Sequence, residues 1–349
     1  MVLPVSVRCS VCGDMNSGVT FLCQSCNNLV LPDIPDVLDP LLPNSLFNQR
    51  YLIAEQVGSG GFAAVYKAVD TQMDNRQVAI KEINLSKLDL QAALDATDTF
   101  YREVSFLSRL THTNLPRIYG ACRDSKHFYL IMNFIAGETL EAYQNRLLMQ
   151  KTLLPLSEVL SIGLQLCAVL EYLHAQEPPI VFRDLKPANI MRTPQRRLFL
   201  IDFGIARHFR PGQARDTIAL GSLGYAAPEQ YGKTQTTPLA DIYSLGAVLH
   251  QLLSGNDPSE APFRFAPLSI DSLSSLSRLG ALIAQMVEME MDKRPTSITL
   301  IRQELQYIAN VWKAAMLNFW RPGPEHTSSQ VIGRNSYASG YGGLNQQKN

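Results

Sequence analysis

The feature that most constrains this chain is a set of six short motifs, rich in glycine and charged residues, that long apolar stretches separate. In chain order the six motifs are Gly58-Ser59-Gly60, Val78-Ala79-Ile80-Lys81, Glu103, Asp184 to Asn189, Asp202-Phe203-Gly204 and Ala227-Pro228-Glu229. Any one of them alone says little. Charged groups from both halves of a chain act together only if the fold gathers them around one cleft. The sequence therefore predicts two parts that face each other across a site.

The first motif lies between two segments with a period of two. Tyr51 to Val57 alternates before the glycines and Val65 to Val69 alternates after them, which predicts a strand, a turn and a second strand. A dinucleotide-binding fingerprint would open a helix instead. An ordinary glycine-rich hairpin is the simpler alternative, but such a turn also lets backbone N–H groups approach a phosphate. The residues that we expect to bind a nucleotide here are Val57, Gly58, Ser59, Gly60, Gly61, Phe62, Ala63, Ala64 and Val65.

A lysine ends the apolar, strand-like run from Val78 to Lys81, where a lone ammonium group would be costly. Lys81 therefore needs an anionic partner. Glu103 lies close to the apolar stripe of a helix predicted over residues 100–110, so it can face inward. Each residue taken alone is more typical of a solvated surface. Together they predict an ion pair in which Glu103 directs Lys81 toward phosphate groups.

Four of the six cysteines form two Cys-x-x-Cys pairs, Cys9 with Cys12 and Cys23 with Cys26. Two such pairs supply the four thiolates of a structural zinc site, and the metal would supply folding free energy that a short segment lacks. We expect a zinc ribbon over residues 1–30. The alternatives are adventitious pairs or a redox dithiol, although redox pairs usually lie in a βαβ pattern that is absent here. Cys122 and Cys167 have apolar neighbours and should be buried packing residues.

Composition and charge exclude several classes of protein. The 349 residues have a formal net charge of zero and carry no basic stripe, so we expect no nucleic-acid partner. No apolar run approaches the roughly 18 residues that span a bilayer, and the start of the chain lacks a signal-peptide core, which predicts no membrane span and a cytoplasmic location. Prolines over residues 31–48 predict a semi-stiff linker, and the polar, glycine-rich stretch 321–349 predicts a disordered tail.

The most specific signal comes from the fourth and fifth motifs. Phe182-Arg183-Asp184-Leu185-Lys186-Pro187-Ala188-Asn189 precedes Asp202-Phe203-Gly204, which follows a short apolar strand over residues 198–201. With the other four motifs in the same order, the chain resembles eukaryotic-type serine/threonine protein kinases of the bacterial kind. The resemblance implies an α+β, bilobal kinase domain over residues 49–312. The small, mostly β lobe would span 49–133 and the large, mostly helical lobe 134–312.

The resemblance also implies a site that binds ATP and Mg²⁺. Asp184 would orient the substrate hydroxyl, and Lys186 would neutralise charge on the transferred phosphoryl group, while Asn189 and Asp202 would ligate Mg²⁺. Adenine would lie against Ala79, the gatekeeper Met132 and the hinge, which runs from Asn133 to Ile135. A lysine two places after the aspartate is typical of serine/threonine kinases. The expected partners are therefore proteins with serine or threonine hydroxyls, and a homodimer would allow autophosphorylation in trans.

Three positions depart from the pattern of the family. Phe182 replaces the usual histidine and should keep its packing but lose a hydrogen bond. Ala63 replaces the third glycine, which stiffens the flap. Ser222 replaces a threonine and should keep the hydroxyl contact with the catalytic aspartate and lysine. In the activation segment, which the resemblance places from Ile205 to Ala226, a phosphate on Thr217 would pair with Arg183, and the alternative is a solvated loop threonine.

Two further charged residues should support the large lobe. We expect Asp241 to bind backbone amides of the catalytic loop and Arg294 to pair with Glu229. The departures at Phe182 and Ala63 leave one rival hypothesis, a pseudokinase scaffold that binds nucleotide or partners without catalysis. Against it stand the five groups that would touch phosphate, metal or hydroxyl, all of them present: Lys81, Asp184, Lys186, Asn189 and Asp202.

Overall fold

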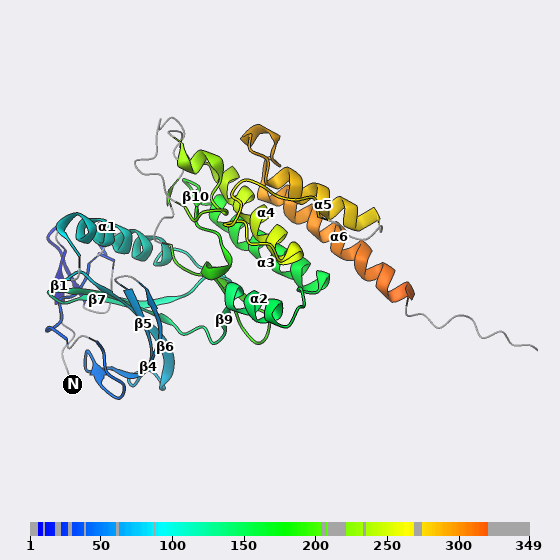
Figure 1. The fold of residues 1–349 in the computed structure, drawn as a ribbon. Coiled ribbons are helices and arrows are strands. Elements are labelled where there is room, and N and C mark those ends of the chain that lie inside the picture. Colours follow the sequence, from blue (N-terminus) through cyan, green and yellow to red (C-terminus); the bar gives the residue numbers. More distant parts are fainter. Residues whose placement is uncertain are drawn as a thin grey trace, which may run out of the picture.

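Two lobes follow one another along the chain in the computed structural model, the first built on a sheet and the second on helices (Figure 1). The predicted α+β, bilobal fold is confirmed. The structure describes residues 6–9, 11–17, 22–26, 30–37, 40–60, 63–86, 88–203, 207–208, 221–232, 235–268 and 274–319.

The small lobe contains a six-stranded antiparallel sheet with the order β3-β4-β5-β6-β8-β7. Its strands are β3 (Leu46–Phe47), β4 (Tyr51–Gly60), β5 (Ala63–Asp70), β6 (Arg76–Asn84), β7 (Ile118–Arg123) and β8 (His127–Asn133). The pairing of β4 with β5 runs as far as Gly60 opposite Ala63, so the hairpin predicted at the glycine motif is confirmed. Gly61 and Phe62, between the two strands, lie outside the described residues.

One long helix, α1 (Leu90–Leu107), lies along the sheet of the small lobe (Figure 1). The carboxylate of Asp89 caps it by accepting a hydrogen bond from the backbone N–H of Ala92 at 2.8 Å. Phe100 and Val104 are fully buried on the inner face, and the ring of Phe100 stacks on Phe128 of β8 with centroids 4.8 Å apart. This face fixes the rotation of the helix and turns Glu103 inward.

The large lobe consists mainly of helices, with a few short strands on the side that faces the small lobe. Its elements are β9 (Glu138–Thr139), α2 (Leu140–Met149), α3 (Leu156–His174), β10 (Ile180–Val181), η1 (Pro187–Asn189), β11 (Ile190–Arg192), β12 (Leu198–Leu200), β13 (Arg207–His208), η2 (Pro228–Tyr231), α4 (Pro238–Ser254), α5 (Ser274–Met286), η3 (Met291–Lys293) and α6 (Ile298–Phe319). At the centre, α4 begins with Pro238 after the Thr237 cap and ends at Gly255, whose φ of 78° is left-handed. At the end, α6 continues without a break past residue 312, where we expected the domain to finish.

Among the helices in the described part of the chain, α3 alone has the length and hydropathy of a membrane span. Of that apolar stretch, 56% is buried inside the protein. It packs against α4 and α6, so its apolar character serves the core of the large lobe.

The cysteine-rich N-terminal segment forms a hairpin of its own, in which β1 (Ser6–Arg8) pairs with β2 (Met15–Ser17). Val30 packs with the cysteines of this module, whereas its neighbour Leu31 belongs to the main hydrophobic core of the kinase-like part. One residue pair therefore joins two cores.

The stretch over residues 31–48, predicted as a linker, packs on the small lobe. Asp33 forms a parallel bridge with Arg123 at the outer edge of β7, and the N–H of Ile34 donates to the carbonyl of Arg123 at 2.8 Å. Farther along, Phe47 is 1% exposed in the core beneath the sheet. The apolar residues between the prolines account for this packing, because they bury surface that a solvated linker would expose.

Candidate functional site

A cavity of about 410 Å³ lies where the two lobes meet. It is lined by both lobes, and a mostly apolar wall with a few charged groups is typical of nucleotide-sized ligands. The predicted adenine contacts Ala79, Met132, Asn133 and Ile135 all line it. The full lining is Val57, Gly58, Val65, Ala79, Lys81, Glu103, Leu107, Pro116, Met132, Asn133, Phe134, Ile135, Gly137, Thr139, Asn189, Met191, Ile201 and Asp202.

Lys81 points from β6 into this cavity and binds two carboxylates from distant parts of the chain. Its Nζ donates to Glu103 Oε2 at 2.6 Å and lies 3.5 Å from Asp202 Oδ1. Burial alone would lower the pKa of Lys81, but the charges of Glu103 and Asp202 outweigh burial and raise the pKa above its usual value. The predicted ion pair is confirmed, and the lysine keeps its charge beside the exposed carboxylate of Asp202.

Asp184 and Lys186 lie next to the cavity on the loop before η1. One oxygen of Asp184 accepts from Ser222 Oγ at 2.7 Å, and the other accepts from Asn189 Nδ2 at 2.8 Å. Lys186 Nζ donates to Ser222 Oγ at 2.6 Å and lies 3.1 Å from the Asp184 carboxylate. The expected contact of the Ser222 hydroxyl with both residues is confirmed. Three side chains thus fix the carboxylate of Asp184, and one of them, Asn189, also lines the cavity.

The loop that carries Asp184 is held from below by Asp241, in the first turn of α4. Its two oxygens accept hydrogen bonds from the backbone N–H groups of Phe182 and Arg183 at 2.9 and 2.8 Å, as the sequence predicts. His174 Nε2, at 2.8 Å from the same carboxylate, is a partner that sequence reasoning missed. The ring of Phe182 packs edge-on against Phe203 at 5.0 Å, so the packing expected at this position is confirmed.

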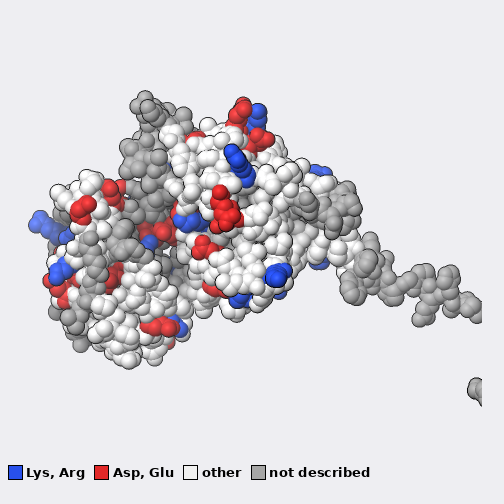
Figure 2. Space-filling model, viewed as in Figure 1, with Lys and Arg blue, Asp and Glu red and all other residues white. Residues whose placement is uncertain are grey.

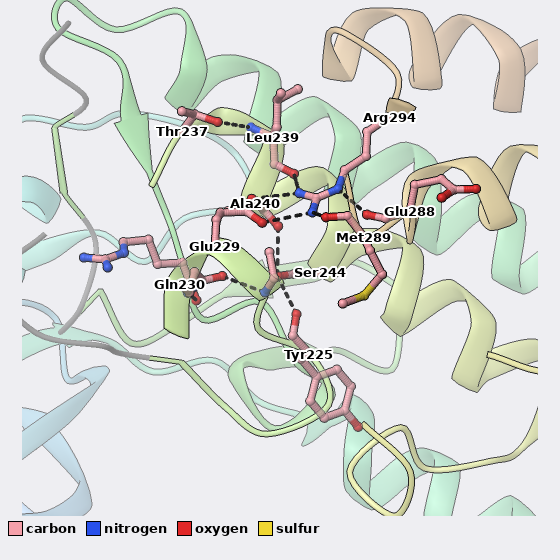
Figure 3. A network of polar contacts seen from close by, with 12 residues as sticks. Tyr225, Glu229, Gln230, Thr237, Leu239, Ala240, Ser244, Glu288, Met289 and Arg294 are labelled. Atoms are coloured by element: carbon pink, nitrogen blue, oxygen red, sulfur yellow. Dashed lines mark hydrogen bonds and ion pairs between the residues drawn. The ribbon is translucent and has the colours of Figure 1, made fainter. Parts of the chain in front are cut away.

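The Ala-Pro-Glu motif is anchored deep in the large lobe (Figure 3). Arg294 NH1 and NH2 donate to the two carboxylate oxygens of Glu229 at 2.7 and 2.9 Å, which confirms the predicted pair. The same guanidinium group donates to backbone carbonyls of Leu239, Glu288 and Met289. Nearby, Ser244 Oγ donates to the carbonyl of Tyr225 at 2.9 Å. The end of the activation segment is thereby fixed to α4.

The family model of the protein kinase domain matches residues 51–307. The chain belongs to the protein kinase family. The match covers both lobes and all six motifs, which explains why the motifs converge on one cleft.

Several protein kinases of known sequence are similar to this one. A probable serine/threonine-protein kinase of Clostridium acetobutylicum is 33% identical over 278 residues, which cover 76% of this chain and 41% of that protein. A probable serine/threonine-protein kinase of Lactococcus lactis is 32% identical over 250 residues, or 70% of this chain and 38% of that protein. One from Arabidopsis thaliana is 34% identical over 205 residues, covering 57% and 48%. This chain thus spans about two fifths of the length of the two bacterial relatives.

Some residues that line the cavity of the kinase domain were not singled out from the sequence. Met191 lies in β11 and Ile201 directly follows β12, and strand alternation after Asn189 is the signal that could have indicated Met191. Gly137 is a second case. A Cβ atom there would lie 2.2 Å from the carbonyl oxygen of Arg192, so only glycine permits this close approach of two chain segments.

Other predicted residues lie outside the cavity or outside the described chain. Ser59, Gly60, Ala63 and Ala64 belong to the β4–β5 hairpin, but do not line the cavity in this structure. Thr217 and most of the activation segment lie outside the described residues. Arg183, its predicted partner when phosphorylated, is 1% exposed. Acidic and basic side chains alternate over the face of the kinase shown in Figure 2, in keeping with zero net charge.

The four N-terminal cysteines come together in a cluster that fits a metal ion. Their Sγ atoms all lie within 4.8 Å of one another, with Cys9 and Cys26 at 3.5 Å and Cys12 and Cys23 at 3.4 Å. These separations exceed a disulfide bond of about 2.05 Å and suit thiolates around a cation at about 2.3 Å from each sulfur. The N–H of Val11 also donates to Cys9 Sγ at 3.4 Å. The arrangement is compatible with a zinc module.

Two thiols within the cluster differ from each other in pKa. Backbone N–H groups of Cys26 and Ser25 stabilise a thiolate at Cys23 and lower its pKa to about 6. The backbone N–H of Asp14 lowers the pKa of Cys12, but desolvation and the neighbouring thiols together outweigh it and raise this pKa to about 12. Burial raises the pKa of Cys122 and of Cys167 to about 12, with the negative charges of Asp124 and Glu171 adding to the effect, and both thiols are packed in the core as predicted.

Proposed function

We propose that this protein is a serine/threonine protein kinase that transfers the γ-phosphoryl group of Mg-ATP to hydroxyl groups of protein substrates. The observation that carries the proposal is the carboxylate of Asp184, fixed by Ser222, Lys186 and Asn189 beside a cavity that also holds the Lys81–Glu103 pair. The names of the bacterial relatives support the choice of serine and threonine.

Each residue in the cleft has a role that follows from its position. Asp184 orients the substrate hydroxyl and accepts its proton while the new O–P bond forms and the bond to the departing ADP breaks. Lys186, 3.1 Å from Asp184, stabilises negative charge on the phosphoryl oxygens. The ammonium group of Lys81 binds the phosphate groups of ATP, while the apolar part of the cavity takes the adenine ring. Asn189 and Asp202 offer the hard oxygen ligands that Mg²⁺ prefers, and a metal ion held there would neutralise phosphate charge.

The replacement Asp184→Asn tests this assignment. It keeps the shape of the side chain but cannot accept the proton, so kcat should fall about 10²- to 10⁴-fold while ATP affinity stays within about threefold. The measurement is transfer of radiolabelled phosphate from Mg-ATP to a generic acceptor protein, with nucleotide binding followed by fluorescence. Asp95→Asn, on the outer face of α1, is the control and should keep full activity.

The same experiment distinguishes an active kinase from the pseudokinase alternative. A pseudokinase would bind nucleotide but transfer no phosphate in the wild-type protein. Equal transfer by wild type and Asp184→Asn would show instead that a contaminating enzyme produces the signal. A homodimer that phosphorylates itself in trans and a cytoplasmic location stay predictions.

The second part of the proposal is that Cys9, Cys12, Cys23 and Cys26 hold a structural zinc ion. The mutual distances of the four Sγ atoms support a tetrahedral thiolate site, which is the usual closed geometry of structural zinc. With four protein ligands such a site leaves no position for a substrate. We therefore assign it a role in folding the N-terminal module and none in phosphoryl transfer.

A further inference from the structure

Arg183, the residue immediately before Asp184, has an unusual backbone conformation that needs support. Arg183 has a φ of +73°, in the left-handed region that residues other than glycine rarely occupy. Its N–H is held by Asp241, as described above. That contact fixes the peptide between Phe182 and Arg183. The next peptide, between Arg183 and Asp184, sets the direction in which the Asp184 side chain leaves the backbone.

Gln230 holds this second peptide. Its Nε2 donates to the carbonyl oxygen of Arg183 at 2.9 Å, while its Oε1 accepts from the backbone N–H of Ala227 at 3.0 Å. The side chain is 3% exposed, so water competes little for either bond. One buried amide group therefore connects the turn after the activation segment with the backbone of the catalytic loop.

The turn that carries Gln230 is itself immobilised. Gln230 follows Glu229 in η2, and the Glu229–Arg294 pair fixes that turn to the large lobe (Figure 3). The chain also passes closely over the amide group, since a Cβ atom on Gly221 would lie 3.0 Å from Gln230 Nε2. Gln230 is thus positioned from both sides before it reaches Arg183.

We propose that Gln230 is a positioning residue for phosphoryl transfer: by fixing the Arg183–Asp184 peptide, it orients the Asp184 carboxylate and makes this orientation depend on the seating of the Ala227–Tyr231 turn. The kinetic part of this inference rests on the proposed kinase function. The structural part concerns the conformation of the catalytic loop and holds for an active or an inactive protein.

The replacement Gln230→Glu separates the two bonds. A carboxylate keeps the size of the side chain and can accept from Ala227, but it cannot donate to Arg183 and places two oxygens against each other. Misplacement of Asp184 should lower kcat about 10- to 100-fold, with the KM for ATP within about threefold of wild type.

Gln144→Glu is a matched control elsewhere in the large lobe. Gln144 is 2% exposed, and its Nε2 also donates to a backbone carbonyl at 2.9 Å, that of Gln251. The same substitution there removes the same type of bond, but that bond joins α2 to α4 and does not involve the peptide before Asp184. Both variants should lose a similar amount of thermal stability, whereas only Gln230→Glu should lose kcat.

The pH dependence gives a readout that a purely structural role would not move. A buried glutamate has a raised pKa and takes up a proton as the pH falls, and the neutral carboxyl group can again donate to Arg183. The ratio of the kcat of Gln230→Glu to that of wild type should therefore rise between about pH 8 and pH 6, and the ratio for Gln144→Glu should stay flat.

Amide hydrogen exchange over residues 182–189 tests the structural part without any activity measurement. Amide exchange in this loop should be faster in Gln230→Glu than in Gln144→Glu when each variant is measured the same number of degrees below its thermal unfolding midpoint. The inference is overturned if the two variants show the same exchange in this loop, or if folded Gln230→Glu retains the kcat of wild type. Loss of phosphate transfer in the wild-type protein would instead refute the proposed function.

Discussion

Lys81 keeps its positive charge inside the cleft because two carboxylates face it. Glu103 is 2% exposed and Asp202 is half exposed, so only Asp202 is accessible to a ligand from solvent. Glu103 is a fixed partner provided by α1. Asp202, with a φ of +67°, presents its carboxylate to the cavity, where a cation can share it. One lysine therefore bridges a structural anion and a functional one.

Replacing Glu103 by glutamine should uncouple Lys81 from α1. The neutral amide leaves Lys81 to pair with Asp202 alone, which draws the lysine away from phosphate, so kcat/KM for ATP should fall about tenfold or more. Phosphate-transfer rates at several ATP concentrations measure the effect. Glu138→Gln, which breaks the exposed pair with Arg146, is the control and should change kcat/KM less than twofold. Equal effects of the two variants would contradict this role for Glu103.

The identity of most cleft residues could be predicted from spacing, but their neighbours could not. Lys81 and Glu103 stood out because a buried charge needs a partner, and Asp184 and Asp202 because of the motifs around them. Gln230 and His174 carry no such signal. Nothing in the neighbouring sequence indicates a partner for either residue, and only the fold shows that each reaches a residue of the catalytic loop or its support more than 40 positions away.

At the scale of secondary structure, the large lobe depends on how η2 is attached to the helices around it. Arg294 directly follows η3 and binds Glu229 in η2. Its guanidinium group also donates to a backbone carbonyl in the first turn of α4 and to two carbonyls in the segment after α5. A single guanidinium group thus ties three elements together. Because the pair is fully buried, loss of one partner leaves the other charge without compensation.

The replacement Arg294→Met should lower the free energy of unfolding by about 3–5 kcal/mol. Arg302→Met is the matched control, because Arg302 is 49% exposed in its pair with Glu171 on α3, and there the cost should stay below about 1 kcal/mol. Urea unfolding followed by circular dichroism gives both values. A cost below about 1 kcal/mol at Arg294 would mean that the buried pair contributes little to the large lobe.

The type of each element followed from periodicity more reliably than its limits. The period of two before and after Gly58 predicted the β4–β5 hairpin, and the apolar stripe around Val104 predicted the inward face of α1. The helix α6 continues past residue 312, the predicted end of the domain, because the residues after 310 keep a helical pattern with no proline or glycine to stop it before Phe319. The strand β3 was missed because two residues carry no period.

At the scale of the whole molecule, the cysteine module is joined to the kinase domain through packing as well as through the chain. Val30 lies in the core of the module and Leu31 in the core of the kinase domain, and the following residues bind the edge of β7. The last residue of β7, Arg123, is opposite Phe128, whose ring stacks on Phe100 of α1. Disorder in the module would therefore loosen the packing next to α1, the helix that carries Glu103.

Purified protein should contain close to one zinc ion per chain, and Cys12→Ser should lower this content. Removal of zinc with a chelator should reduce the thermal unfolding midpoint by about 2–4 °C or more, because the module loses its core and Val30 loses its neighbours. Elemental analysis and calorimetry measure the two effects. Cys167→Ala, in the core of the large lobe, should lower stability without changing the zinc content. Full stability in the zinc-free protein would refute a structural role for the metal.

The bridge between Asp33 and Arg123 also indicates where a stable fragment of this protein has to begin. A fragment trimmed to residues 51–307, where the family match begins and ends, would bare the outer edge of β7 and remove Phe47, which fills the underside of the sheet. An uncovered strand edge invites pairing with other molecules, and an unfilled hollow under the sheet costs stability. Fragments that start near Val30 should accordingly be monodisperse where shorter ones aggregate.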